Sequence, residues 1–191
     1  MTGAWVGVDP GGRATGIVVR RGTELLWWAV LEREGDDDPV RGVGVAARTV
    51  EMVLAGIGTA LHHAGPGAHL AVEGVTAPVP HINGKVRIID PAPTIAAAVV
   101  LGGILALHPK AVVVPPNRHG HGLLMAYPPE LVTDAERRSG LRREAGQSAL
   151  VRHARSAWDC AGAGPQHLAI TIRHRQRTLV AAAAGYSRRH P

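Results

Sequence analysis

The feature that most constrains the fold lies at the start of the chain, where residues 5–19 read WVGVDPGGRATGIVV. Two stretches rich in valine, around Val6 and Val8 and then at 17–19, flank a turn that is rich in glycine and proline. This pattern predicts two antiparallel strands joined by a tight turn, with Asp9 near the bend. A carboxylate on a buried strand is costly unless a positive group binds it, so the position of Asp9 predicts a metal or phosphate site.

The remaining sequence predicts further strands and helices in a fixed order. A third strand follows the second, and helices then alternate with strands, which predicts a right-handed parallel crossover. Glu73 ends the fourth strand, and Asp159 lies on the last helix. The predicted strands after the hairpin are 24–31, 70–73 and 111–115, and the predicted helices are 43–63, 94–107 and 147–163, with loops at 75–91 and 116–133.

Length and composition limit the class of protein. A chain of 191 residues is long enough for one domain with a substantial core. Cys160 is the single cysteine, which excludes an internal disulfide and a four-cysteine zinc site. Apolar runs such as 95–107 are too short to span a bilayer and no signal sequence is evident, so we expect a cytoplasmic protein without a membrane partner. The scarcity of lysine would suit an actinobacterial or phage source.

Positive charge is concentrated in the second half of the chain. Residues 1–100 contain 8 basic and 10 acidic side chains, whereas residues 101–191 contain 13 basic and 5 acidic ones. A basic surface favours an anionic polymer such as DNA, because each neutralised phosphate releases counterions. The alternative is an ordinary solvated surface.

Three short motifs resemble those of the RNase H-like superfamily and, within it, the RuvC-like Holliday junction resolvases. They read GVDPGGRATG at 7–16, AVEGV at 71–75 and RHARSAWDCA at 152–161. The resemblance implies an α/β fold, with a mixed five-stranded sheet of three antiparallel and then parallel strands, flanked by helices. It covers about the first 165 residues, so we expect a nuclease domain at 1–165 and a basic C-terminal extension at 166–191.

The resemblance also implies a chemistry and a set of site residues. Asp9 would bridge two divalent ions, with Glu73 and Asp159 on either side. Mg²⁺ and Mn²⁺ prefer oxygen ligands, and a pair of such ions activates water and stabilises the leaving oxygen. The implied protein is a homodimeric endonuclease that cleaves branched DNA, most specifically Holliday junctions.

The last motif departs from the family pattern. Resolvases of this type carry an acidic residue or a histidine three positions before the final aspartate, and Ser156 stands there in this chain. His153 lies about 120° away from Asp159 around a helix, so it joins the site only if the helix is tilted or irregular. Ser156 and His153 are therefore the weaker candidates. Arg155 and Asp159 have the spacing of an intrahelical ion pair.

Several basic residues are candidates for contacts with DNA. Lys85 and Arg87 follow the strand that ends in Glu73, and ordinary loop charge is the alternative interpretation for both. The remaining candidates belong to the basic second half, where phosphate contacts would position DNA without reading its sequence. They are Arg118, Arg142, Arg143, Arg152 and Arg155.

Three other polar residues have open interpretations. Tyr127 either stacks on a base or anchors its loop. His119 and His121 form a His-Gly-His segment in a loop, and without a third ligand nearby this is more typical of hydrogen bonding or phosphate contact than of a zinc site.

Two other functions fit parts of the sequence. One is an inert module that binds branched DNA without cutting it, which the serine at position 156 favours. The other is a phosphate-binding domain related to actin-like ATPases and sugar kinases, whose first phosphate motif the segment around Asp9 also resembles. The chain lacks a second phosphate motif of that kind, and junction binding without Mg²⁺-dependent nicking would favour the inert module.

Overall fold

The fold is centred on a mixed five-stranded sheet with the strand order β3-β2-β1-β4-β7. The computed structural model describes residues 3–33, 43–76, 81–82, 85–86, 91–117, 119–145 and 149–187. Strands β1, β2 and β3 are antiparallel neighbours, whereas β4 and β7 run parallel to β1. The sheet strands are β1 (Trp5–Asp9), β2 (Ala14–Arg21), β3 (Glu24–Glu32), β4 (His69–Glu73) and β7 (Val112–Val114). The predicted fold class is therefore confirmed.

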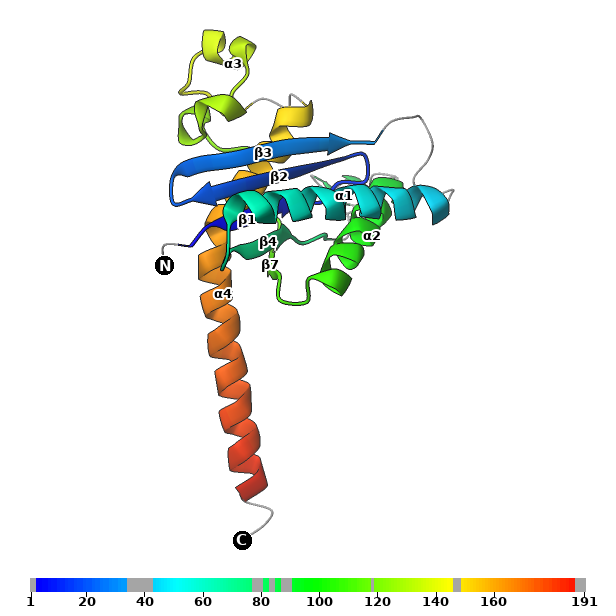
Figure 1. The fold of residues 1–191 in the computed structure, drawn as a ribbon, viewed down its shortest axis with the longest axis vertical. Helices are drawn as coiled ribbons and strands as arrows, with labels where there is room; N and C mark the ends of the chain where they lie inside the picture. The colour runs from blue at the N-terminus through cyan, green and yellow to red at the C-terminus, as the bar shows by residue number, and fades with distance from the viewer. Residues whose placement is uncertain are drawn as a thin grey trace.

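Helices cover both faces of this sheet (Figure 1). Helices α1 (Val43–Ala64) and α2 (Ala92–Leu107) lie on one face, and α4 (Ala149–Ser187) crosses the other. Coverage from both sides explains why the residues of β1 are apolar without alternation, since each side chain meets a helix whichever way it points. Strand β3 lies at one edge and is only partly buried.

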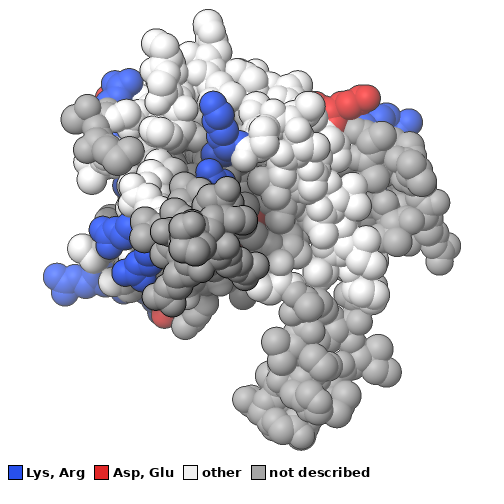
Figure 2. All heavy atoms as spheres, turned by 90° about the horizontal axis from the view of Figure 1, so that it is seen from below, with Lys and Arg blue, Asp and Glu red and all other residues white. Residues whose placement is uncertain are grey.

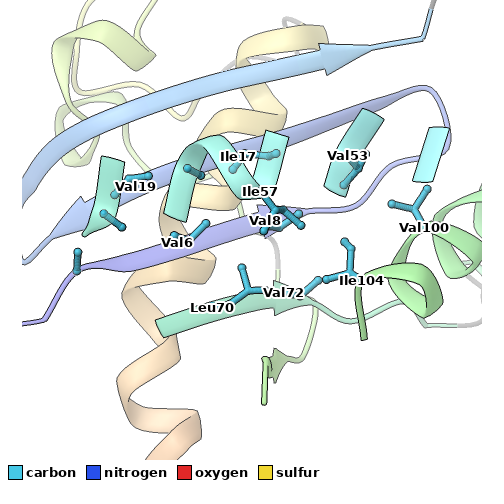
Figure 3. Packing of buried hydrophobic residues seen from close by; sticks show 13 residues of the cluster. Val6, Val8, Ile17, Val19, Val53, Ile57, Leu70, Val72, Val100 and Ile104 are labelled. Atoms are coloured by element: carbon cyan, nitrogen blue, oxygen red, sulfur yellow. The ribbon is translucent and has the colours of Figure 1, made fainter. Parts of the chain in front are cut away.

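The core has a layer on each side of the sheet. On the side of α1 and α2, valine, isoleucine and leucine side chains from the sheet interdigitate with those of the two helices (Figure 3). Fully buried examples are Val8, Ile57 and Ile104. On the other side, Trp158 and Ala157 of α4 pack against Val18. Burying a side chain of this kind stabilises the fold by about 1.5–3 kcal/mol.

Two glycines let α4 lie directly on the central strands. A Cβ at Gly7 of β1 would overlap the carbonyl oxygen of Ala157, and a Cβ at Gly16 of β2 would overlap that of His153. Because the obstructing atoms belong to the backbone, any side chain at these positions would push the helix away. The glycines of the first motif thus set the height of α4 above the sheet, and with it the position of every side chain that α4 presents.

The structure differs from the sequence prediction in two elements. The predicted loop 75–91 contains a short antiparallel pair, β5 (His81–Ile82) and β6 (Lys85–Val86). The last helix does not end near 163, because α4 continues through Pro165 to Ser187. The division into a nuclease domain and a C-terminal extension at 165 stays a prediction.

The connection between β7 and α4 consists of short elements. These are η1 (Leu124–Ala126), η2 (Pro129–Leu131) and α3 (Asp134–Ser139), which begins with a capping box between Thr133 and Glu136. Among the helices that the structure describes, none is long and apolar enough to cross a membrane.

Candidate active site

Two carboxylates meet at the carboxyl ends of the central parallel strands. Strands β1 and β4 pair in parallel with Val8 opposite Val72, and the next step of this register places Asp9 beside Glu73. Both side chains are largely buried, with 16% and 13% of their surface exposed. The sheet therefore brings Asp9 and Glu73 side by side, although 64 residues separate them in the sequence.

The two carboxylates influence each other's ionisation. Burial raises the pKa of Asp9, and the charge and the hydrogen bond of Glu73 raise it further, although His153 acts in the opposite direction. Burial also disfavours the charged form of Glu73, yet hydrogen bonds from His119, Ser156 and Asp9 outweigh it and lower the pKa of Glu73. The two carboxylates are therefore coupled, and a bound cation would offset the unfavourable interaction between their charges.

His153 joins the site through Asp9. Its Nδ1 lies 2.7 Å from Oδ2 of Asp9. An ionised carboxylate only accepts hydrogen bonds, so Nδ1 of His153 is the donor to ionised Asp9 and Nε2 is the ring nitrogen outside this hydrogen bond. His153 belongs to the site although it lies about 120° from Asp159 around the helix. The close contact between Gly16 and α4 brings the His153 backbone directly above Gly16, and Gly16 is the residue paired with Asp9.

Glu73 is held from two sides. Its Oε1 lies 3.0 Å from Nδ1 of His119, and its Oε2 accepts a hydrogen bond of 2.7 Å from the hydroxyl of Ser156. The hydrogen bond to Glu73 raises the pKa of His119, against the opposing effect of its partial burial. Ser156 and His119 thus fix the orientation of Glu73 from two sides.

Asp159 is held by the loop that begins with His119. Its Oδ2 accepts hydrogen bonds of 2.8 Å from the amide of Gly120 and 2.9 Å from the hydroxyl of Tyr127. Tyr127 is buried, with 7% of its surface exposed, so it anchors its loop and does not present a ring for base stacking. Burial, followed by the charge of Asp159, raises the pKa of Tyr127, which stays a hydrogen-bond donor.

Helix α4 supplies its three site residues at regular intervals. His153, Ser156 and Asp159 are each three residues apart, which corresponds to about 4.5 Å along the axis and about 60° around it. The three side chains therefore point in successive directions along one side of α4. His153 contacts Asp9 and Ser156 contacts Glu73, whereas Asp159 contacts the loop 119–127.

The donor set suits a hard divalent cation in part. Asp9 and Glu73 supply neighbouring carboxylate oxygens, the chemistry that Mg²⁺ and Mn²⁺ prefer. In the described part of the chain, no three histidine, cysteine, aspartate or glutamate side chains are grouped so that they could hold an ion as they stand. The residues that fit are thus the Asp9–Glu73 pair, and the predicted role of Asp159 as a third ligand stays a prediction.

One predicted DNA contact is wrong. Arg155 is completely buried, and its guanidinium donates hydrogen bonds of 2.9 and 3.0 Å to the carboxylate of Glu136. It also donates to the carbonyl oxygen of Leu131. Arg155 therefore ties α4 to the connection that carries Tyr127, and its buried guanidinium offers no contact surface for phosphate.

The other predicted DNA contacts have different standings. Arg142 and Arg143 are exposed after α3, and Arg152 is half-buried on α4, where its side chain lies close to Gly120. These three stay candidates. Arg87 and Arg118 lie outside the described residues, as does the side chain of Lys85.

His119 is the site residue that the sequence prediction undervalued. It follows β7, which runs parallel to β4, so its loop begins at the same edge of the sheet as Glu73. The carboxyl ends of parallel strands are where binding residues gather in α/β folds. The position of His119 after a predicted parallel strand was therefore a better indication of a site residue than the His-Gly-His segment itself.

No protein-family model matches the chain, and no curated protein matches it in sequence. Among solved structures, RuvC of Thermus thermophilus in complex with Holliday junction substrate is similar, with 17% identity and a TM-score of 0.47 over 83% of this chain and 90% of that one. Another structure of Thermus thermophilus RuvC has 18% identity and a TM-score of 0.44 over 81% and 90%. At this level of likeness, function has to be inferred from the chain's own residues.

Proposed function

We propose that this protein is a metal-dependent endonuclease that hydrolyses phosphodiester bonds in branched DNA, most specifically in four-way junctions. The observation that carries the proposal is the buried pair of Asp9 and Glu73, with a histidine on each carboxylate. Buried neighbouring carboxylates are costly, so a site that keeps them supports a cation-dependent function.

The divalent ions would be held by Asp9 and Glu73, with Asp159 beside them. When bound, two such ions lower the pKa of a water and neutralise charge on the phosphate. Mg²⁺ or Mn²⁺ fits these oxygen donors better than a softer metal.

The histidines supply the remaining chemistry in this proposal. His153, oriented by Asp9, takes up a proton at Nε2 as the water oxygen bonds to phosphorus. The bond from phosphorus to the 3′ oxygen breaks, and this oxygen takes a proton from solvent to become the 3′-hydroxyl. His119, whose pKa is raised by its hydrogen bond to Glu73, stabilises in its protonated form the negative charge that develops on the phosphate oxygens. Ser156 and Tyr127 hold Glu73 and Asp159 in place. The expected products carry 5′-phosphate and 3′-hydroxyl ends.

Symmetric cleavage of a junction needs two sites, so the proposal includes a homodimer. The outer face of α2 supports it, because this helix contains no charged residue and leaves Ile95, Val99 and Leu107 exposed by 47%, 43% and 65%. An apolar helix face of this kind is typical of a surface that another protein covers.

A cleavage assay with three substrates tests the proposal. A four-way junction, a flap and a plain duplex are incubated with Mg²⁺, Mn²⁺ or a chelator. Paired nicks on the junction in the presence of either metal are expected, with none in chelator. Cleavage of the duplex at the same rate as the junction would contradict the branched-DNA specificity, and cleavage in chelator would contradict the metal dependence.

The second candidate is an inert module that binds branched DNA without cutting it. Ser156 favours it, because this residue donates its hydroxyl to Glu73 and adds no negative charge to the site. Tight junction binding in the assay above, without nicks under any metal condition, would favour this candidate.

A further inference from the structure

The C-terminal arm, defined as residues 166–187 of α4, projects away from the body of the molecule (Figure 1). The last contact with the core that the described side chains show is that of Leu168, which packs against the cluster around Trp5. Beyond it, every side chain from 170 to 178 is exposed. Such a helix gains little from tertiary packing, although packing is the main source of helix stability in proteins.

The charge of the arm has one sign. Residues 160–191 contain five arginines and no aspartate or glutamate. Arg173 and Arg177 are like charges four residues apart on one helix face, an arrangement that destabilises an isolated helix. Arg175 points to the opposite side, because two residues correspond to about 200° around a helix. The arm therefore has no acidic residue that could neutralise it, and a polyanion would remove its internal repulsion.

The view from the end at which α4 projects agrees with this charge distribution. Most of the charged atoms visible on that face belong to Lys and Arg (Figure 2). Arg173, Arg175 and Arg177 are among the exposed residues of the described part of the arm. A partner that approaches this end therefore meets a basic surface, which attracts an anionic polymer.

We infer that the C-terminal arm binds the phosphate backbone of duplex DNA, as a second contact on the same substrate as the candidate active site. The inference rests on the proposed function for the identity of that substrate. Arg173 and Arg177 lie 14 and 18 residues after Asp159, which corresponds to roughly 21–27 Å along a helix. For a duplex lying along α4, the arm contacts the backbone roughly six to eight base pairs from the cleaved bond.

The test is a salt titration of binding to a synthetic four-way junction in chelator. A triple variant, Arg173→Gln with Arg175→Gln and Arg177→Gln, removes three charges and keeps good helix formers. A second triple variant with lysine at the same positions keeps the charge. The control removes three exposed charges elsewhere, through Arg21→Gln, Arg48→Gln and Lys110→Gln.

The glutamine variant is expected to bind about tenfold more weakly or worse near 0.1 M salt, and its slope of log K against log salt falls by about 2 to 3. The lysine variant keeps the wild-type slope, and the control changes it less. Equal slopes for the glutamine variant and the control would overturn the inference. A change in sedimented mass without a change in junction affinity would overturn it in favour of a protein contact.

The outcomes separate this inference from the proposed nuclease. If the wild type binds the junction with an arm-dependent slope but never nicks it with Mg²⁺ or Mn²⁺, the arm inference is supported and the nuclease is not. If the wild type nicks the junction and the arm variant binds and nicks as the control does, the arm inference fails and the nuclease stands.

Discussion

At the scale of single residues, His153 has the most specific role in the proposed mechanism after the carboxylates. Its Nδ1 is fixed on Asp9, which leaves Nε2 for proton exchange. Replacing His153 with alanine is therefore expected to slow single-turnover cleavage by about 10²- to 10⁴-fold, the usual contribution of a general base, while junction affinity is nearly unchanged.

Ser156→Ala is the matched control for this prediction, since Ser156 lies on the same helix and bonds to the neighbouring carboxylate. It orients Glu73 without exchanging protons with the substrate, so a smaller loss is expected. Equal losses in the two variants, or no loss in His153→Ala, would contradict the role of His153.

Glu136 is a second residue with a defined role, because it neutralises the fully buried Arg155. Burial alone would raise the pKa of Glu136, but hydrogen bonds from Thr133 and the charge of Arg155 outweigh it and hold the pKa below the ordinary value of 4.5. A carboxyl group with a lowered pKa stabilises the fold above its unfolded-state pKa, and that contribution is lost as the pH falls through the folded-state value.

Glu136→Gln is therefore expected to lower the free energy of unfolding by about 3 kcal/mol at pH 7, because it takes the carboxylate from a buried guanidinium. The difference between wild type and variant shrinks as the pH falls below about 4.5. Urea unfolding followed at several pH values measures it, with Glu130→Gln, an exposed position, as the control. A pH-independent difference would show that the charge is not the cause.

At the scale of elements, the contact of α4 with β1 and β2 positions the site. Gly16→Ala places a Cβ against the His153 carbonyl, so we expect a loss of about 1–3 kcal/mol in unfolding free energy and a larger fractional loss of cleavage. Gly58→Ala, on α1 with nothing within 4 Å of its Cβ, is the control and is expected to stabilise by about 0.5–1 kcal/mol. A neutral Gly16→Ala would show that α4 tolerates displacement.

At the scale of the whole molecule, the apolar face of α2 predicts a dimer. Val99→Glu puts a charge at its centre, where 43% exposure leaves the fold itself unaffected. Sedimentation is expected to show a dimer for the wild type and a monomer for Val99→Glu. In the cleavage assay the wild type is expected to make paired nicks on the junction, and Val99→Glu single nicks. Ala55→Glu, exposed on α1, is the control. A dimeric Val99→Glu would move the interface elsewhere.

Much of the molecule follows from local pattern. The hairpin around Asp9, the strand that ends in Glu73 and the helix that carries Asp159 were predictable, because apolar periodicity and turn residues specify elements, and parallel strands bring their carboxyl ends together. What the pattern leaves open is how closely two elements approach. The sequence makes His153 only a weaker candidate, because the helical wheel refers to Asp159 alone, whereas the close contact at Gly16 brings the helix down onto Asp9.

Arg155 failed for a different physical reason. Arginine is usually exposed, so a basic helix near a presumed active site was interpreted as a DNA surface. Its burial depends on Glu136, which lies 19 residues earlier in a connection without strong periodicity. The ion pair between Arg155 and Glu136 depends on how α3 and α4 pack in the tertiary structure. A single sequence does not show that packing.

The central claim is that Asp9 holds a catalytic cation in a junction-cleaving nuclease, and the Asp9→Asn variant tests it most directly. Asparagine keeps the size of the side chain and removes the charge beside Glu73. We predict that the wild type nicks a four-way junction with Mg²⁺ or Mn²⁺ and that Asp9→Asn binds the same junction with similar affinity but does not cut it. Cleavage by Asp9→Asn at the wild-type rate would contradict the account.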